Sequence, residues 1–246
     1  MTANLKKIAF VSKREDLSQF EFERYWRSHH GPLLSSIPDY RDWRQRYLQN
    51  HIVGNGPLGN AFTYAGLAEF WLPGISSGES GFVATSFYKE RIQPDEGNFT
   101  DADKTVAMTA SEQIVIPGGG PVKIFVISKR ISSITDDDFA KRLVTEYVYP
   151  IQNDSVLTSE LRGWSIDLVM ANSSYRPGAV KVDNDMADCV ESFWFSNKDD
   201  AWSFLTSTAF GNVRENFLQT ATSIFVDEYE MFDDCAPGEG GLEIER

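Results

Sequence analysis

The chain has 246 residues, 41% of them hydrophobic and 13% aromatic, and a formal net charge of −13 at pH 7. This composition supports a hydrophobic core in one large domain or two ordinary ones and argues against disorder. The negative charge disfavours nucleic-acid binding, because a phosphate backbone would be repelled. No apolar run reaches the length of a membrane span, and the first 15 residues have no signal-peptide core. With Cys189 and Cys235 giving no disulfide framework, we expect a cytoplasmic protein.

In chain order, the first half predicts a strand, a helix, two strands, a helical region and a last strand. The short apolar run at 6–13 is typical of a strand. Ser18 and Glu21 have the spacing of a capping box, which predicts the start of a helix. Gly31 and Pro32 are expected to end that helix. The remaining strands are predicted at 44–53, 64–72 and 111–116.

The second half repeats this order. The sequence KKIAFVSKR at 6–14 recurs as VKIFVISKR at 122–130, and LAEFWL at 67–72 recurs as VESFWF at 190–195. Thr135, followed by three aspartates, predicts the start of the equivalent helix. The strands of this half are predicted at 122–130, 163–170, 188–195 and 222–232.

The repeat predicts an α+β fold of two tandem ferredoxin-like units. The order βαββαβ forms an antiparallel sheet with both helices on one face, so the other face needs a partner. Two units in one chain can cover each other and form an intrachain dimeric α/β-barrel. We expect a first unit at 1–116, a PGGGP linker at 117–121, a second unit at 122–233 and a flexible acidic tail at 234–246.

All three histidines, His29, His30 and His51, lie in one short region. Phe22, Trp26 and one of the two adjacent histidines fall at helical spacings of three and four, which places them on one face. Periodicity does not choose between His29 and His30. A histidine at a helix end often only hydrogen-bonds free carbonyls, so a structural role is the alternative to a catalytic one.

Alternation along the next strand places Tyr47, Gln49 and His51 on one face. Three polar side chains on a buried sheet face are unusual, because each needs a partner. This face therefore either lines a pocket or lies in solvent. Aromatic residues nearby would suit a flat hydrophobic ligand, although most are expected to be core. The candidate substrate-binding residues are Trp26, Tyr40, Trp43, Gln49 and Phe70.

Several kinds of chemistry lack their motifs. The histidines do not have the spacing of a metal site, and no glycine-rich phosphate loop follows a strand. Neither cysteine has a histidine in its half of the chain. We therefore expect neither a metal nor a cofactor, and chemistry based on acid–base groups in a shaped pocket.

The stretch FERYWRSHHGPLLSSIPDY…YLQNHIV resembles the EthD family of dimeric α/β-barrel proteins, and DEGNF at 95–99 resembles a further segment of that family. Four extra residues before Tyr47 leave open whether Tyr47 or Trp43 lines the cavity. The second half resembles the family only in outline, with EYVYP in place of SHHGP. The residues that carry the resemblance are Phe22, Trp26, His30, Gly31, Pro32, Pro38 and residues 47–51.

The resemblance favours His30 over His29 and implies that His30, Tyr47 and His51 are catalytic. His30 would be the general acid or base, Tyr47 and His51 would stabilise an enolate-like or phenolate-like charge, and Gln49 would orient the substrate. Family members pair as homodimers, so this chain resembles a fused pair, as a monomeric pseudo-dimer or a homodimer of it.

The implied function is that of a cofactor-independent lyase or isomerase, of dehydratase or cyclase type, acting on a small aromatic or polyketide-like molecule. The expected partner is that small molecule, with neither nucleic acid nor membrane. A cofactor-free monooxygenase and a non-catalytic small-molecule binder are the alternatives.

Overall fold

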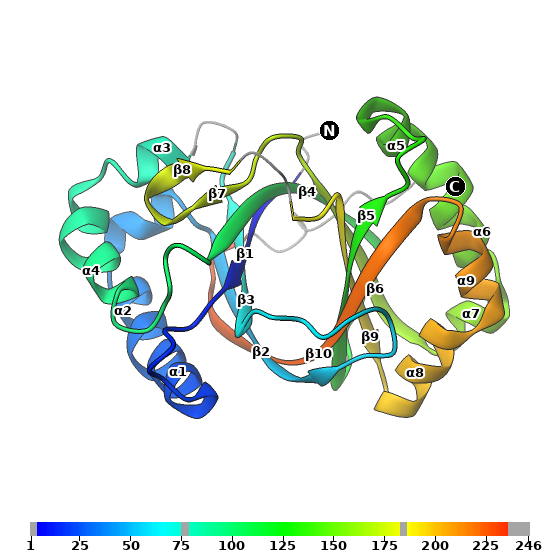
Figure 1. Ribbon diagram of the computed structural model, residues 1–246, viewed down its shortest axis with the longest axis horizontal. Coiled ribbons are helices and arrows are strands. Elements are labelled where there is room, and N and C mark those ends of the chain that lie inside the picture. Colours follow the sequence, from blue (N-terminus) through cyan, green and yellow to red (C-terminus); the bar gives the residue numbers. More distant parts are fainter. Residues whose placement is uncertain (1–3, 75–78, 183–185, 236–246) are drawn as a thin grey trace.

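The computed structural model describes residues 4–74, 79–182 and 186–235. Its long strands close into an antiparallel barrel with a layer of helices on either side (Figure 1). The predicted α+β barrel is confirmed. The barrel strands are β1 (Asn4–Val11), β2 (Arg46–Asn55), β3 (Gly66–Leu72), β4 (Val106–Ile116), β5 (Val122–Arg130), β6 (Leu161–Val169), β9 (Cys189–Phe195) and β10 (Leu218–Asp233). A hairpin of β7 (Tyr175–Arg176) and β8 (Val180–Lys181) pairs with β4.

The strand order explains how the two halves form one barrel. The order is β1-β3-β2-β10-β5-β9-β6-β4, and β4 pairs back onto β1. Each half thus contributes four adjacent strands in the same relative order, and the halves meet at β2–β10 and β4–β6. Closure removes the exposed edges that either sheet would have alone. Since both halves share one barrel, the division at 117–121 stays a prediction, and the tail beyond residue 235 lies outside the described residues.

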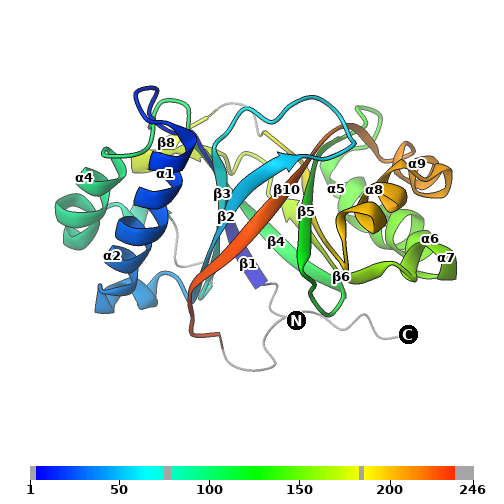
Figure 2. The same cartoon turned by 90° about the horizontal axis from the view of Figure 1, so that it is seen from below.

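The helices of each half cover the outer face of that half's strands, as the two views show (Figures 1 and 2). Ser18 and Glu21 form the predicted capping box, and Thr135 caps the equivalent helix. No described helix has the length and apolar character needed to cross a membrane. The first layer contains α1 (Gln19–Tyr25), η1 (Trp26–His30), α2 (Gly31–Ser35), η2 (Pro38–Asp42), α3 (Glu79–Phe82), η3 (Tyr88–Ile92) and α4 (Gln93–Glu96). The second half contains α5 (Asp136–Arg142), η4 (Leu143–Val148), α6 (Tyr149–Gln152), α7 (Ser155–Thr158), η5 (Pro177–Ala179), α8 (Lys198–Thr206) and α9 (Thr208–Arg214).

The first helix does not end at Gly31 and Pro32, so that prediction is wrong. Residues 26–30 form a π-helical turn, closed by a hydrogen bond from the Gly31 amide to the Trp26 carbonyl, and the chain continues as α2. Pro32 stands in the first turn of α2, where the fixed φ of proline suits a helix. The backbone of Gly31 has the right-handed helical conformation, with φ at −55°. Its lack of a side chain serves close packing, because a Cβ there would clash with the Met231 sulfur.

The structural repeat differs by one residue from the sequence repeat. In the sheet, Lys6 is opposite Trp71 and Lys123 is opposite Trp194. Trp71 and Trp194 are equivalent positions of the repeat, so Lys6 is the structural counterpart of Lys123. The sequence alignment of KKIAFVSKR with VKIFVISKR instead pairs Lys7 with Lys123. Neighbouring residues of a strand face opposite sides of the sheet, so this shift changes which side chains enter the barrel.

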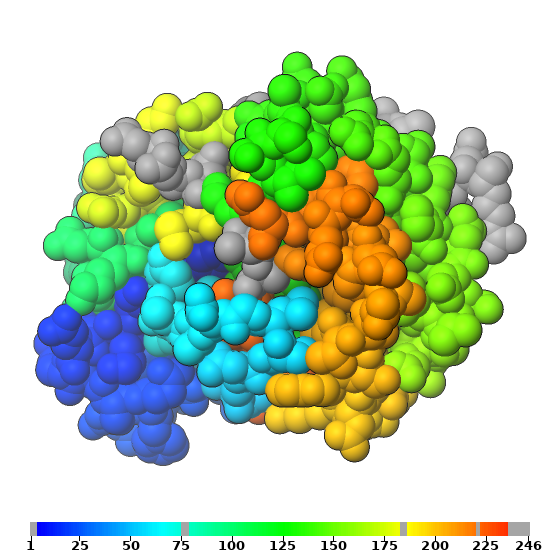
Figure 3. Space-filling model, turned by 45° about the vertical axis from the view of Figure 1, so that its right-hand side comes forward, coloured from blue at the N-terminus to red at the C-terminus, as the bar shows by residue number. Residues whose placement is uncertain are grey.

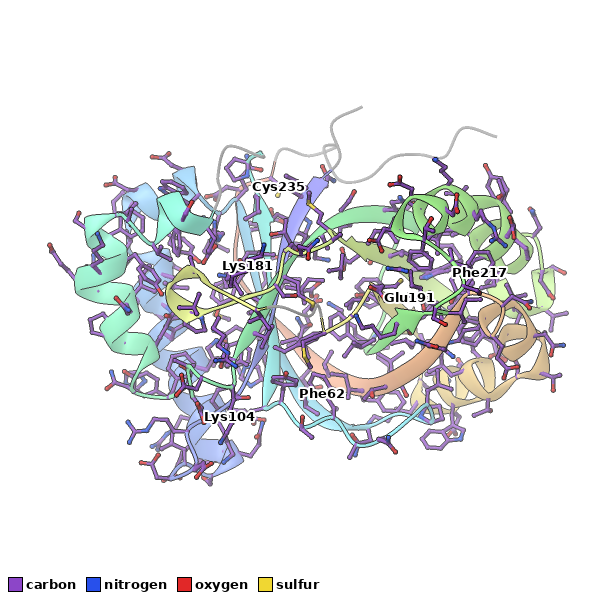
Figure 4. All side chains as sticks on the ribbon, turned by 45° about the horizontal axis from the view of Figure 1, so that its top comes forward. Phe62, Lys104, Lys181, Glu191, Phe217 and Cys235 are labelled. Atoms are coloured by element: carbon purple, nitrogen blue, oxygen red, sulfur yellow. The ribbon has the colours of Figure 1, made fainter. Side chains whose placement is uncertain are left out.

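The barrel interior is apolar at one end and charged at the other. At the apolar end Phe10 packs edge-on against Phe62, with ring centroids 5.5 Å apart, and the cluster continues to Phe125. The space-filling view shows the β2–β3 connection, which carries Phe62, in cyan between the two helical layers (Figure 3). Phe62 and Cys235 mark opposite ends of the barrel in Figure 4.

At the charged end Lys6 reaches three carboxylates. Its Nζ lies 2.7 Å from Glu69, 2.9 Å from Glu112 and 3.0 Å from Asp167, and all four side chains are buried. Glu69 and Glu112 belong to the first half and Asp167 to the second. These ion pairs therefore link the two halves inside the barrel, where each charge depends on its partners.

Lys123 forms the equivalent cluster from the opposite wall. Its Nζ lies 2.7 Å from Glu69, 3.1 Å from the Asn50 side-chain oxygen and 2.5 Å from Glu228. Glu69 thus bridges both lysines. Burial alone would raise its pKa, but the two ammonium groups outweigh burial and hold it well below the usual range.

Replacing Lys6 with methionine is expected to destabilise the protein by about 3–5 kcal/mol, because three buried carboxylates lose a cation. Urea unfolding of both proteins at pH 7.5 measures the difference. Lys104→Met is the matched control, since Lys104 is exposed and pairs at the surface with Glu15 and Asp101; it should cost about 1 kcal/mol or less. Equal losses from the two substitutions would contradict a structural role for the network.

Candidate functional site

A cavity lies between the barrel and the helices of the first half, with a volume of about 60 Å³. The helix and the strand on which polar site residues were predicted meet there. Four of the predicted residues line it, which are Trp26, His30, Tyr47 and Phe70.

His30 reaches the cavity from the π-helical turn and is buried. Its Nδ1 is 2.7 Å from an Asp95 carboxylate oxygen. Burial would raise the pKa of Asp95, but hydrogen bonds from His30 and Tyr25 outweigh burial and lower it. The ionised carboxylate accepts a hydrogen bond from Nδ1–H, which leaves Nε2 as the ring nitrogen available at the cavity. His29 is exposed and stacks on Tyr25, so His30 is the histidine that faces inward.

Tyr47 presents a hydroxyl whose proton neither polar neighbour accepts. Its oxygen accepts hydrogen bonds from Trp26 Nε1 at 2.8 Å and from Gln49 Nε2 at 3.0 Å. Burial raises the pKa of Tyr47, so it stays a neutral phenol. Because a phenol both donates and accepts, its O–H can donate to a ligand oxygen in the cavity.

Gln49 and His51 lie behind Tyr47 and do not line the cavity. Gln49 Nε2 also donates to the Trp26 carbonyl at 2.9 Å, and His51 Nε2 is 3.2 Å from the Gln49 amide oxygen. Burial and the nearby Arg27 lower the pKa of His51 to about 4, so its ring is neutral and donates to that oxygen. The chain His51–Gln49–Tyr47 therefore fixes the position of the phenol, and the predicted catalytic role of His51 is indirect in this geometry.

Tyr40 and Trp43, both predicted to touch substrate, lie outside the cavity. Tyr40 packs edge-on against Phe82 and Phe232. Trp43 also packs against Phe82. The sequence left open whether Tyr47 or Trp43 lines the cavity, and the structure places Tyr47 there.

The segment DEGNF supplies three site residues that were not among the predicted ones. Asp95 holds His30, Phe99 packs against the His30 ring at 4.8 Å, and Glu96 lines the cavity. Tyr88 donates to Glu96 at 3.2 Å. Burial raises the pKa of Glu96 even though His30 opposes this. The resemblance at 95–99 was the sequence signal for these residues.

A second carboxylate, Glu79, holds cationic partners at the cavity wall. It lies 2.9 Å from Lys7 and 2.7 Å from Arg44 and accepts from the Tyr175 hydroxyl at 3.2 Å. Burial would raise the pKa of Glu79, but the two cations outweigh burial and lower it. Tyr175 and its neighbour Pro177 belong to the second half, which therefore closes the cavity of the first. No local motif indicated this contact.

Among the described residues, no group of three or more His, Cys, Asp or Glu side chains could hold a metal ion. The polar groups at the cavity instead form small hydrogen-bonded clusters, each of which joins a titratable group to a partner. The pairs are His30 with Asp95, Glu96 with Tyr88, and Lys7 with Glu79. Such pairs suit proton transfer and the binding of oxygen-bearing groups.

Residues 14–103 match the EthD domain family. Over 97% of each chain, the structure resembles an anthrone oxidase-like protein with a TM-score of 0.58 and 9% identity. It also resembles a proposed monooxygenase from Lactobacillus acidophilus (TM-score 0.51, 9% identity, 92% of this chain and 94% of the other). A chlorite dismutase variant from Candidatus Nitrospira defluvii gives 0.52 at 10% identity over 92% of each chain. Likeness at these identities establishes the fold, and no curated protein sequence matches significantly.

The second half fills the equivalent region with side chains. Tyr147 takes the place of His30, and its hydroxyl lies 2.9 and 3.0 Å from the two Glu191 carboxylate oxygens. Trp164 Nε1 donates to the same carboxylate at 3.2 Å. Glu191, labelled in Figure 4, is fully buried, and burial raises its pKa to about 7.

Glu191→Gln should raise the melting temperature at pH 8 and change it little near pH 4.5. The unfolded carboxyl ionises near pH 4.3 and the folded one only near 7, so stability falls as pH rises between these values. A neutral glutamine avoids this loss, which is about 4 kcal/mol above pH 7. Thermal unfolding at both pH values measures the effect, with the exposed Glu146→Gln as control. A gain independent of pH would contradict a buried, ionising Glu191.

Proposed function

We propose that this chain, whose residues 14–103 match the EthD domain family, is a cofactor-independent enzyme that moves protons on a small, flat, oxygen-bearing molecule. The reaction class is that of a lyase or isomerase, of dehydratase or cyclase type, on an aromatic or polyketide-like compound. One observation carries the proposal: a histidine held by a carboxylate and a phenol with an uncommitted proton line the same buried cavity.

Proton abstraction next to a carbonyl uses these groups directly. His30 Nε2 takes the proton from carbon, the electrons of the C–H bond form a C=C bond, and the π electrons of the carbonyl move to its oxygen. Asp95 stabilises the imidazolium that forms, while the Tyr47 hydroxyl donates to the developing oxyanion. The three residues thus act on one substrate from two sides of the cavity.

The second step decides the reaction type. If the enolate electrons return to a different carbon and take up the proton there, the result is isomerisation. If they form a C=C bond and expel a β-hydroxyl, which leaves as water after protonation, the result is dehydration. Glu96 lines the same cavity with a raised pKa and is the candidate acid for that proton.

The walls indicate the kind of substrate. Trp26, Phe70 and Phe99 supply flat apolar surface. At about 60 Å³ the cavity is smaller than typical ligand sites of about 300–1,000 Å³. A substrate with fused rings therefore requires wall side chains to move outward on binding.

His30→Gln is expected to lower turnover by about 10²–10⁴-fold, because it removes the proton-transfer group and keeps the side-chain volume approximately. Tyr47→Phe should lower it by about 10²-fold through loss of the oxyanion donor. Product formation from a panel of aromatic lactones and β-hydroxyketones, followed by liquid chromatography and mass spectrometry, measures both. The exposed neighbour variant His29→Gln serves as control. If the His30→Gln variant folds and keeps full turnover, His30 is not the acid–base group.

A cofactor-free monooxygenase is the second candidate, because the same base and oxyanion donor would generate a substrate carbanion that can react with O₂. Conversion of a CH₂ group with O₂ to C=O and water balances without another reductant. Two of the fold neighbours are described as anthrone oxidase-like and as a proposed monooxygenase.

An oxygen electrode separates the candidates. One O₂ consumed per product indicates the oxygenase, whereas product without oxygen uptake indicates the lyase or isomerase. A compound that is retained unchanged by the wild-type protein would indicate a binding protein and contradict both.

A further inference from the structure

A second and larger cavity opens at the charged end of the barrel, with a volume of about 320 Å³. It lies on the inner face of the strands, whereas the cavity that contains His30 lies on the outer face of the first half. Cys235, which is labelled in Figure 4, is one of the residues that line it. Both halves of the chain contribute to its walls.

Two tryptophans face each other across this cavity. Trp71 is on β3 and Trp194 on β9, which are four positions apart in the eight-stranded ring and therefore on opposite walls. Lys6 Nζ lies 4.4 Å from the Trp71 ring centre, and Lys123 Nζ lies 5.1 Å from that of Trp194. Both indoles are partly exposed, so the cavity offers flat aromatic surface on two sides.

The two lysines are not available to bind an anion. An ammonium group has three donors. Lys6 uses them on three carboxylates, and Lys123 uses them on Glu69, Glu228 and the Asn50 amide oxygen. Arg46, at the rim, is paired with Glu230 at 3.0 Å and Asp233 at 3.1 Å.

Acceptors, in contrast, are in excess around the cavity. Three carboxylates that contact the two lysines line the cavity, which are those of Glu69, Glu112 and Glu228. The Ser165 hydroxyl lines the cavity, is 4% exposed as a residue and has no hydrogen-bond partner among the described residues. A buried hydroxyl without a partner is costly, so a ligand that hydrogen-bonds to it would be favoured. This environment selects a ligand that carries positive charge and hydrogen-bond donors.

We propose that the barrel cavity is a second ligand site, which binds a small aromatic amine as its cation, with the ring between Trp71 and Trp194 and the ammonium against the carboxylates and the Ser165 hydroxyl. The indoles supply stacking and cation–π attraction. The carboxylates supply the charge that an anionic or neutral analogue cannot use. This site does not depend on the reaction proposed for the first cavity.

Tryptamine tests the proposal as a cationic probe, with indole-3-acetate as the matched anion on the same ring. Isothermal titration calorimetry of the full chain at pH 7.5 should give one saturable site for tryptamine and binding at least tenfold weaker for indole-3-acetate. Trp194→Leu should weaken tryptamine binding at least tenfold. Trp202→Leu is the control, because Trp202 is exposed on α8 and away from the cavity, and it should leave binding unchanged.

A second variant keeps the test decisive if Trp194→Leu does not fold. Glu228 is partly exposed, and Glu228→Gln removes one negative charge with little change of shape; we expect about fivefold weaker binding of tryptamine. His30→Gln should not alter that binding. Absence of tryptamine binding, equal binding of the two probes, or loss of binding in His30→Gln would each overturn the proposal.

Discussion

The Glu69 carboxylate bridges Lys6 and Lys123, one lysine from each half of the chain, at 2.7 Å to each. No buried charge in this group can exist without its partners, because burial disfavours every isolated one. The bridge is complete only when β1, β3 and β5 stand in their observed places in the closed barrel. The buried charges are therefore neutralised only when the barrel closes, and the barrel can close only with these charges paired.

The same strands carry the candidate active site on their other face. On β1, Lys6 enters the barrel and Lys7 lines the outer cavity. On β3, Glu69 points inward while Phe70 lines that cavity. Because alternate side chains face opposite sides, a slip of one residue would bury the wrong charges and move every cavity residue away. The inner ion pairs therefore fix the register that places Tyr47 opposite His30.

Local patterns in the sequence predicted most of the fold. The capping residues Ser18 and Thr135 and the eight barrel strands follow from nearest-neighbour chemistry and alternation, and the structure confirms them. The helix end at Gly31 was wrong, because the need for close packing at Met231 is not visible along the chain. The sequence repeat aligns Lys7 with Lys123. The strand pairing in the sheet shows that Lys6 is the structural counterpart of Lys123.

The candidate site was partly predictable, because some of its residues lie close together in the sequence. His30, Tyr47 and Trp26 are neighbours in local motifs, and they meet at the cavity. The partner of His30, Asp95, is 65 residues away, and Tyr175 comes from the other half of the chain. Spacing rules do not reach such distances, because tertiary packing decides these contacts. Only the resemblance of DEGNF to a family segment pointed toward Asp95.

Comparison of the two halves shows how one barrel can keep an open cavity on one side. At the position where Ala68 leaves space in the first half, the second half has Glu191, which reaches Tyr147 and Trp164. These side chains replace His30 and Tyr47 and satisfy one another, so they contribute to packing and leave no uncommitted donor at that point. Meanwhile the second half supplies Tyr175 to the wall of the first cavity. If the unit was duplicated and the cavity of the second copy was then filled by side chains, the second half could serve to stabilise the barrel and to enclose the cavity of the first half.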